Sequence, residues 1–504
     1  MDTYRVKIKS DGTMDKLKVR IVVRGDLQRN FSNDDTWSPT ASVRLLKVFL
    51  AHATHCKCRV QQLDFIGAFL QANVRERVFV KLPARYGDLF PEFAPYCGRP
   101  LRLTKSMYGM NYAGKNWWQD LSDWLLSTGF QASSVHPCLM WRKTNSHYLI
   151  LLNYVNDMLY FSTDKQIETN FTTTLAQRFK VEFLGNAHWF LSLRINQLAD
   201  YSIRVDQSRY AKAITHRYTN TLNTHLKPTY DQPLPSDWVP SKTDCSATTD
   251  ASIALEQHYN LDYRSCTGAL LYLNCTRPDI VFAVMKLVKF NLNPGRPHFE
   301  ALIHLLGYIR DHSLYGLQFY SNTHDSPVYS LLSQHNITTK RDLFAFSDSS
   351  WQDCPDTGRS TGSFLIFYKG GVVDHSSFLP DPVAMSSGEA EYNTACATCI
   401  AVAHLRMLTN KLITLSSSDP PNQEPVTIIL DNTAAIKMGQ SFRDTRHTRH
   451  ILRRYHYVRQ GKLDGLHHLS WITNKMQLAD NGTKPLTPAE ALPRQKIFLV
   501  PVEV

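Results

Sequence analysis

The chain has 504 residues, of which 43% are hydrophobic and 20% are charged. These values are typical of folded globular proteins and exclude wholesale disorder. The length predicts about three domains at roughly 100–200 residues each. Lys and Arg number 56 against 44 Asp and Glu, and the net charge of +12 favours a polyanionic partner, although many ordinary proteins are equally basic.

The ten cysteines follow no disulfide or zinc-binding spacing, and Cys56 and Cys58 are too close together for a C-x-x-C site. The opening segment, MDTYRVKIKS, has no apolar signal region, and no run reaches the about 18 apolar residues that a membrane span needs. We therefore expect reduced thiols, no secretion signal, no membrane partner, and a cytoplasmic or nuclear location.

In the first part of the chain, LKVRIVVRG alternates basic and apolar residues as a half-exposed strand does. Its cations either contact phosphates or protect an exposed strand edge. They are Lys18, Arg20 and Arg24. A helix is expected in SVRLLKVFLAHATH, then a strand, RVQQLD, that leads to Asp64. A further helix is expected from about Tyr112 to Gly129.

Two apolar runs in HYLILLNYVNDMLYFST predict a β-hairpin with Asn156 and Asp157 at its tip. Y-x-N-D alone is most often an ordinary turn, but polar groups buried at such a tip cost free energy unless they bind something. Acids here and at Asp64 are the ligand type of two-metal phosphoryl transfer, in which the ions lie about 3.5–4 Å apart. One ligand of this centre is neutral, because position 156 carries an amide.

The middle of the chain offers no catalytic chemistry. A polar segment with four prolines, from Leu222 to Ser252, predicts a linker that closes the first domain. Beyond it, RSCTGALLYLNCTRPDIVFAVMKLVKF has helical periodicity, with a helix start near Pro278. We expect a structural role for this block.

The last part combines predicted strands with a long helix, and several of these elements carry acids. RDLFAFSDSSW predicts a strand that ends near Asp348, and SFLIFY with VVDHSSF predicts a hairpin. A long helix is expected in SSGEAEYNTACATCIAVAHLRMLTNKL, and VTIILD predicts another strand. Acids at strand ends and at a helix start converge in an α/β site more readily than scattered surface charges do. The candidates are Asp348, Glu391, Asp431 and Asp480, with Glu389 as the alternative on the helix.

The stretch RDTRHTRHILRRYHYVRQ contains six arginines and one acid. Its histidines do not indicate a metal site, because the interleaved arginines would repel a dication. Either a phosphate-binding helix or a solubilising face fits this composition, and we favour the first. The proposed phosphate contacts are Arg449, Arg453 and Arg454.

The order of these motifs resembles the reverse transcriptase and ribonuclease H region of the Pol polyprotein of copia-type LTR retrotransposons. The resemblance runs from about Tyr4 to Leu486, through QQLDFIGAFL, LTKSMYGMNYAGKNWW, NYVNDML, FSDSSW, SSGEAEY, ILDN and QLADNGTKP. It implies an α+β palm with fingers, followed by a connecting domain and an α/β ribonuclease H-like domain. The corresponding ranges are 1–222 for the transcriptase, 223–338 for the linker and a connection or thumb-like region, 339–486 for the nuclease, and 487–504 for a tail.

By position, the resemblance implies that Asp64 and Asp157 are polymerase acids. Asn156 then replaces the first aspartate of the family's Tyr-Val-Asp-Asp hairpin, in which Tyr154 is the tyrosine. Tyr108 and Gly109 match a stretch close to the incoming nucleotide and the template. Three neighbouring positions also depart from the family pattern: Tyr112 for glutamine, Gly114 for proline and Ser192 for glycine. These departures predict a weakened polymerase.

The resemblance also implies that Asp348, Glu391, Asp431 and Asp480 form a ribonuclease H centre that cuts the RNA of an RNA–DNA hybrid. The implied cofactor is Mg²⁺ or Mn²⁺, and the implied partners are an RNA template, a DNA primer, the hybrid and dNTPs. The cytoplasmic location would include virus-like particles. Two alternatives remain open: a domesticated or degenerate protein that binds nucleic acid without catalysis, and a relic that is never translated.

Overall fold

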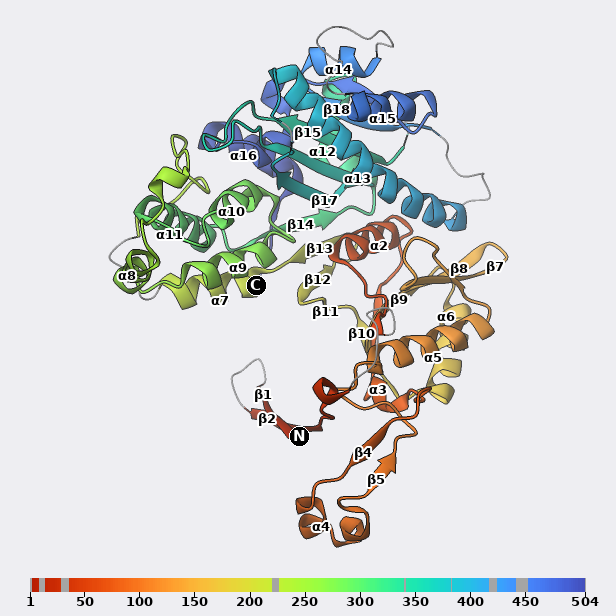
Figure 1. Cartoon of the computed structure of the whole chain (residues 1–504). Helices are drawn as coiled ribbons and strands as arrows, with labels where there is room; N and C mark the ends of the chain where they lie inside the picture. Colours follow the sequence, from red (N-terminus) through yellow and green to blue (C-terminus); the bar gives the residue numbers. More distant parts are fainter. Residues whose placement is uncertain are drawn as a thin grey trace. The chain divides into compact units, whose positions relative to one another are not determined.

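The computed structural model describes residues 2–8, 14–28, 36–219, 226–339, 341–381, 383–416, 424–440 and 452–503. The chain divides into two compact units. The first consists of Met1–Ser42 and Val60–Asn186, and the second of Val43–Arg59 and Ala187–Val504 (Figure 1). Within the described ranges, no helix combines the length and the apolar character needed to cross a bilayer.

The first unit is built on a six-stranded sheet in the order β10-β3-β9-β8-β7-β6. Its strands are β3 (Gln61–Phe65), β6 (Gln131–Ala132), β7 (Leu139–Thr144), β8 (His147–Tyr154), β9 (Asp157–Ser162) and β10 (Val181–Asn186). The predicted hairpin is β8 and β9, which are antiparallel. Because β9 also pairs with β3, the tip of this hairpin lies beside the strand that carries Asp64.

Helices α3 (Ala68–Gln71), α5 (Ala113–Ser127) and α6 (Lys165–Arg178) accompany this sheet. Their apolar side chains form one core with the strands, and Trp117 and Phe171 are among its largest buried members. Asp164 caps α6, since its carboxylate accepts a 2.8 Å hydrogen bond from Ile167 N. Two hairpins complete the unit: β1 (Asp2–Ile8) with β2 (Met14–Ile21), and β4 (Phe79–Lys81) with β5 (Pro100–Arg102), which flank α4 (Arg85–Leu89).

The second unit contains a five-stranded sheet in the order β11-β12-β13-β14-β20 and a group of helices. The strands are β11 (Trp189–Phe190), β12 (Leu193–Gln197), β13 (Ile203–Asp206), β14 (Tyr315–Phe319) and β20 (Val500–Pro501). The helices are α7 (Ser208–Thr219), α8 (Thr249–Tyr259), α9 (Tyr263–Leu273), α10 (Val281–Val288) and α11 (Arg296–Asp311). The apolar faces of these helices share one core, and α9 and α10 lie in the stretch whose periodicity predicted helices.

A second sheet of this unit has the order β17-β16-β15-β18-β19. Its strands are β15 (Leu343–Ser349), β16 (Gly362–Tyr368), β17 (Gly371–Phe378), β18 (Val426–Leu430) and β19 (His467–Trp471). Strands β15, β16 and β17 are antiparallel, whereas β18 runs parallel to β15 and β19. The helices are α12 (Pro327–Gln334), α13 (Ser387–Ser416), α14 (Thr433–Gln440) and α15 (Leu452–Leu463). The predicted mixed α and β fold class is therefore confirmed in both units.

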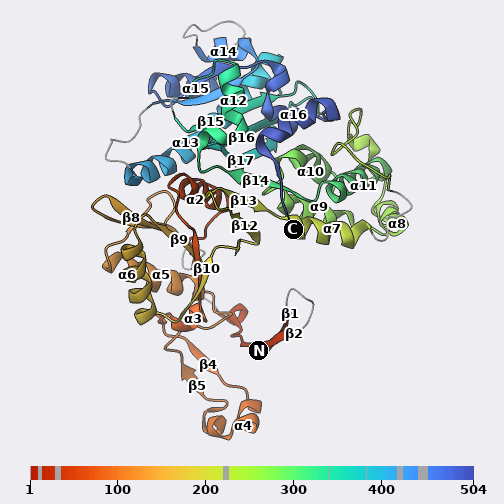
Figure 2. The same ribbon diagram turned by 180° about the vertical axis from the view of Figure 1, so that it is seen from behind.

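Two segments pack in places that the motifs did not predict. Helix α2 (Val43–His55) precedes most of the first unit in the chain but belongs to the second, where Arg44 Nη2 lies 2.8 Å from Asp374 Oδ2 on β17. The described part of the expected tail, residues 487–503, contains α16 (Pro488–Phe498) and β20. Phe498 and Leu499 are buried in the core, and α16 contacts α12 (Figure 2). A short helix that contains two prolines shows little periodicity in the sequence, which explains the difference.

Candidate active sites

The tip of the β8–β9 hairpin brings three predicted residues of the first unit together. Asp64 and Asp157 are direct partners in the antiparallel β3–β9 pair. Phe65 N donates a 2.8 Å hydrogen bond to Asn156 O, which ties the turn to β3. The backbone therefore delivers Asp64, Asn156 and Asp157 to one edge of the sheet.

Asn156 occupies this site as a hydrogen-bond donor. Its Nδ2 lies 2.5 Å from Asp64 Oδ1. An ionised aspartate at this position has no proton to donate and would instead place two like charges together. The amide thus satisfies one oxygen of Asp64 with a hydrogen bond. If position 156 carried a carboxylate, that oxygen would remain available to a cation.

Asp157, the acid at the tip of the hairpin, is only half-buried, and its ionisation is nevertheless opposed. Burial, together with the nearby charge of Asp64, raises the pKa of Asp157 to about 6. A carboxyl group whose ionisation is opposed by burial and by a neighbouring acid is typical of a cation-binding position.

The turn itself is strained. Val155 has φ of 56°, in the left-handed region that β-branched residues avoid. Its carbonyl accepts a hydrogen bond from the indole N–H of the buried Trp117. The packing of α5 thereby holds the tip in this conformation.

The predicted substrate-proximal residues of the first unit surround a tight backbone crossing. Gly109 has φ of 88°, and a Cβ there would lie 2.2 Å from Val23 O. Tyr108 O accepts a 2.8 Å hydrogen bond from Val23 N, and the Arg20 guanidinium lies 5.3 Å from the centre of the Tyr108 ring. Only glycine fits at position 109 without a backbone shift.

The positions of the other predicted residues of this region say less about their function. Tyr154 ends β8 and is the register partner of Asp157. Arg24 is exposed and forms a 2.6 Å ion pair with Asp26. Lys18 lies on β2.

Two of the departures from the family pattern occupy sterically sensitive positions. Ser192 follows Leu191 in the two-residue turn between β11 and β12, and both have positive φ, 56° and 50°. Such a turn favours glycine or asparagine, which explains why a glycine is usual at this position. Gly114 lies in the first turn of α5, where a Cβ would come within 3.1 Å of Ser38 Oγ.

Three of the acids predicted in the last part of the chain converge in the second unit. Asp348 comes from β15, Glu391 from α13, and Asp431 follows β18. One carboxylate oxygen of each lies within 4.8 Å of the others. Among the described residues, this is the single group of three or more His, Cys, Asp or Glu side chains that is close enough to share an ion.

Asp348 is the most strongly perturbed of these acids. It is buried, and burial followed by the charges of Asp480 and Asp431 raises its pKa to about 8. Thr483 Oγ1 donates a 2.6 Å hydrogen bond to Asp348 Oδ2, which partly offsets this shift. The side chain therefore retains its proton near neutral pH until a positive charge is supplied.

Glu391 is also buried, and burial together with the charges of Asp348 and Asp431 raises its pKa well above the usual range. One oxygen accepts a 3.2 Å hydrogen bond from Ser349 N, while Oε2 is buried without any hydrogen bond. Glu389, the alternative, accepts a 2.8 Å hydrogen bond from Met385 N near the start of α13. Glu391 is thus the member of the pair that joins the cluster.

Asp431 is half-buried, and burial followed by the charge of Asp480 raises its pKa. Asn474 Nδ2 donates a 3.0 Å hydrogen bond to Asp431 Oδ2, and the Trp471 indole N–H donates to Asp431 O at 3.0 Å. Sequence reasoning missed both neighbours, because neither belongs to an acidic motif.

Asp480 lies beside the cluster, in the 3₁₀ helix η8 (Leu478–Gly482), and is fully buried. Arg494 Nη2 donates a 2.9 Å hydrogen bond to its Oδ2, and Lys484 Nζ lies 3.0 Å from its Oδ1. Its charge is therefore balanced by two cations. Arg494 was also missed, since it comes from the segment expected to be a tail.

The donor set fits a hard divalent cation. Mg²⁺ and Mn²⁺ prefer carboxylate oxygens, which are the only ligands that the cluster offers. The buried Glu391 Oε2, which accepts no hydrogen bond, is a ligand atom that a cation would satisfy.

The proposed phosphate contacts are described only in part. Arg449 lies outside the described residues. Arg453 and Arg454 lie on α15, whose backbone is helical as predicted.

Comparisons with known proteins support the resemblance seen in the motifs. Residues 3–231 match the family described as reverse transcriptase (RNA-dependent DNA polymerase). The chain is 26% identical over 460 residues to a retrovirus-related Pol polyprotein from transposon TNT 1-94 of Nicotiana tabacum, which covers 90% of the chain and 32% of that polyprotein. It is 27% identical over 487 residues to the corresponding polyprotein from transposon RE1 of Arabidopsis thaliana, covering 96% of the chain and 30% of that polyprotein.

Among solved structures, ribonuclease H1 from the halophilic archaeon Halobacterium salinarum NRC-1 aligns with 30% of the chain and 97% of its own length, at 17% identity and a TM-score of 0.21. The chain spans about a third of the length of the two Pol polyproteins. The predicted resemblance is confirmed: residues 3–231 match the reverse transcriptase family, and most of the chain is similar to Pol polyproteins of plant retrotransposons.

Proposed function

We propose that the second unit of this chain cleaves the RNA strand of RNA–DNA hybrids and that the polymerase centre of the first unit is impaired. The convergence of Asp348, Glu391 and Asp431 carries the proposal for the nuclease. The strands and the helix that carry these three acids are separated by up to about 80 residues of chain, yet each directs an acid toward the same point. Surface charges distributed at random do not converge in this way.

Each group of the cluster has a definite task in this proposal. The three acids would hold Mg²⁺ or Mn²⁺, which supplies the activation of water and the stabilisation of the leaving 3′-oxygen. Glu391 Oε2 and Asp348 face the common point, and Thr483 fixes Asp348 by its 2.6 Å hydrogen bond. The basic residues of α15, Arg453 and Arg454, would contact phosphates of the hybrid without reading bases.

The test is a cleavage assay of the full chain on a labelled RNA–DNA hybrid with Mg²⁺ or Mn²⁺. Asp348→Asn should reduce the rate by about three decades or more, since a unit charge about 4 Å from another contributes on the order of 4 kcal/mol and about 1.4 kcal/mol is tenfold. Hybrid affinity, measured by fluorescence anisotropy in EDTA, should change little because phosphate contacts come from other residues.

Asp381→Asn is a matched control, because the Asp381 side chain is 92% exposed. It should cleave at the wild-type rate. The nuclease proposal fails if the folded wild-type chain shows no metal-dependent cleavage, or if Asp348→Asn cleaves as fast as wild type. Binding of hybrid without cleavage would then favour the second candidate, a nucleic-acid-binding protein without catalysis.

For the first unit we favour that second candidate over an active polymerase. The observation is the Asn156–Asp64 hydrogen bond, which engages a carboxylate oxygen that a cation would need. RNA template, DNA primer and dNTPs remain proposed partners of this centre, with binding expected to persist where catalysis is weak.

A further inference from the structure

The two cations on Asp480 differ in their freedom to move. The side chain of Arg494 is 4% exposed, whereas that of Lys484 is 42% exposed. A buried guanidinium in contact with several acceptors is fixed, whereas a half-exposed lysine can leave its partner at little cost. Arg494 therefore determines the orientation of Asp480, and Lys484 contacts the other carboxylate oxygen, Oδ1.

Arg494 also contacts a second part of the acidic site. Its Nη2 donates to Asn474 O at 2.9 Å as well as to Asp480, and its Nη1 donates to Glu490 O at 3.1 Å. The side chain of the same Asn474 donates to Asp431 Oδ2 at 3.0 Å. One guanidinium thus connects directly to Asp480 and, through Asn474, to Asp431.

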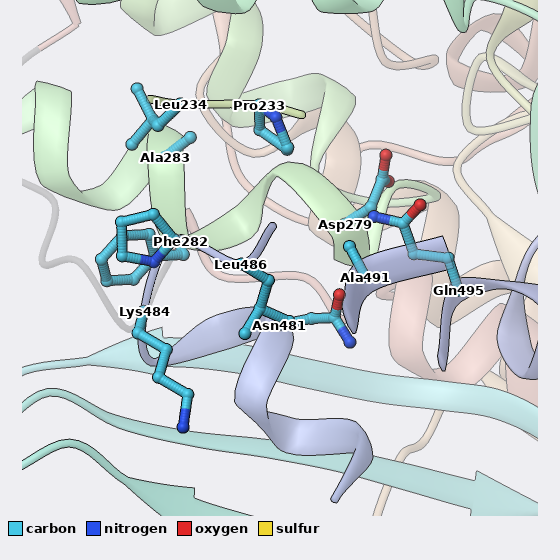
Figure 3. A pocket seen from close by; sticks show the side chains of 11 residues that line it. Pro233, Leu234, Asp279, Phe282, Ala283, Asn481, Lys484, Leu486, Ala491 and Gln495 are labelled. Atoms are coloured by element: carbon cyan, nitrogen blue, oxygen red, sulfur yellow. The ribbon is translucent and has the colours of Figure 1, made fainter. Parts of the chain in front are cut away.

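The helix that carries Arg494 is anchored by the buried side chains of Ala491 and Phe498. Ala491 and Gln495 of α16 line a small pocket together with Asn481 and with Phe282 of α10 (Figure 3). Figure 3 also shows the Lys484 side chain extending away from Leu234 and Ala283, with its amine directed out of the pocket. Because α16 packs against η8, a shift of this helix would move Arg494 and Asp480 together.

We infer that Arg494 is a positioning residue of the metal site, which holds Asp480 and Asp431 at the spacing that a divalent cation requires. The inference rests on the proposed nuclease function and extends it to a segment beyond the acidic motifs. Electrostatics alone predicts the opposite effect, since removing a cation near the site should strengthen the binding of a dication. The sign of the change in metal affinity therefore separates positioning from simple charge repulsion.

The experiment measures Mn²⁺ binding to the full chain by electron paramagnetic resonance of the free ion. Arg494→Met should raise the half-saturating Mn²⁺ concentration by about tenfold or more, the usual cost of losing a residue that orients a metal ligand. Arg494→Lys, which keeps the charge but not the fork of donors, should restore part of the affinity. Lys496→Ala removes the same charge from an exposed position of α16 and should leave Mn²⁺ binding unchanged.

A double-mutant cycle with Asp480→Asn tests the route of the effect. If Arg494 acts through Asp480, Arg494→Met should weaken Mn²⁺ binding far less in the Asp480→Asn chain than in the wild-type chain. A folded Arg494→Met chain that binds Mn²⁺ as well as wild type, or more tightly, overturns the inference. If Arg494→Met does not fold, the cycle of Arg494→Lys with Asp480→Asn decides, and additive effects then overturn it.

The outcomes also separate this inference from the proposed function. Weaker Mn²⁺ binding by Arg494→Met in a chain that cuts no hybrid would support the positioning role and contradict the nuclease. Metal-dependent cleavage by wild type, with unchanged Mn²⁺ binding by Arg494→Met, would support the nuclease and contradict the positioning role.

Discussion

At the scale of single residues, Asn156 decides the character of the hairpin tip. Its amide donates to Asp64, so that the pair is satisfied without a cation. An aspartate in the same place would leave Asp64 without this donor and would add a third negative charge beside Asp64 and Asp157. The added negative charge would favour the binding of a divalent cation at this tip.

We predict that Asn156→Asp raises the rate of primer extension on an RNA template by about three decades. The gain follows from the added charge, since about 4 kcal/mol at an effective dielectric near 20 corresponds to that factor. Gel-based extension assays with Mg²⁺ and Mn²⁺ measure it. Asn145→Asp, in the exposed turn between β7 and β8, is the control and should have no effect. Efficient extension by wild type that Asn156→Asp does not change would contradict the prediction.

A second prediction concerns pH. The pKa of Asp348 is raised to about 8, against 3.8 as its ordinary value, so the native state binds a proton that the unfolded state has released throughout that window. Metal-free stability should therefore fall as pH rises from about 4 to 8, by at most about 1.4 kcal/mol per pH unit from this group. Above pH 8 its contribution becomes constant.

Calorimetric melting in EDTA between pH 5 and pH 8 tests this slope. Asp348→Asn should flatten it, because an amide does not titrate. Added Mn²⁺ should raise the melting temperature of wild type most at pH 8, where the acids release their protons to solvent most readily as they bind the ion. An equal slope in wild type and Asp348→Asn would show that other groups govern the pH dependence.

Some of the site residues were predictable from the sequence for a clear reason. Asp348 and Asp431 end apolar strands, and Glu391 lies in the first turns of a helix, so that secondary structure alone directs them to one place. Arg494 was not predictable in this way. It lies 14 residues beyond Asp480, and its contact depends on tertiary packing rather than on any local motif.

At the scale of secondary structure elements, strands and long helices were predicted well because their periodicity is strong. The apolar runs of β15 and β18 are buried throughout, as expected for strands covered on both faces. The packing partners of these elements were not predicted. Helix α2 was expected from its amphipathic pattern, but the pattern does not show that Arg44 would pair with Asp374, which is more than 300 residues away.

Helix α16 and strand β20 lead to a further prediction. A chain that ends at Leu486 loses the buried Phe498 and Leu499 and the partner of β14. Each such side chain contributes about 1.5–3 kcal/mol when fully buried, so the melting temperature of the second unit should fall markedly. Cleavage should be lost with it, because Arg494 is removed.

Differential scanning calorimetry and the hybrid cleavage assay measure these two effects. Phe498→Ala in the full chain should reproduce part of the destabilisation while keeping Arg494 in place. A chain ending at Leu486 that melts and cleaves like the full chain would show that α16 and β20 are dispensable.

At the scale of the whole molecule, the divisions suggested by the motifs do not coincide with its compact units. The resemblance implied a nuclease range of 339–486, which stays a prediction. Within the second unit, however, the buried Lys286 of α10 lies 2.5 Å from Asp353 Oδ2, and His375 Nε2 lies 2.7 Å from Asn274 O. Motifs mark the positions of chemistry, whereas buried polar contacts of this kind are visible only in three dimensions.

The pairing of β14 with β20 has a consequence for biosynthesis. Strand β14 starts at Tyr315 and its partner at Val500, so that the ribosome adds 500 − 315 = 185 residues between them. At about 5–20 residues per second, this takes about 10 to 40 s. During that interval the nascent chain presents β14 as an unpaired edge, at which another nascent chain can add a strand. Chaperone protection of the growing chain would be most valuable in this interval, before the last strand closes the sheet.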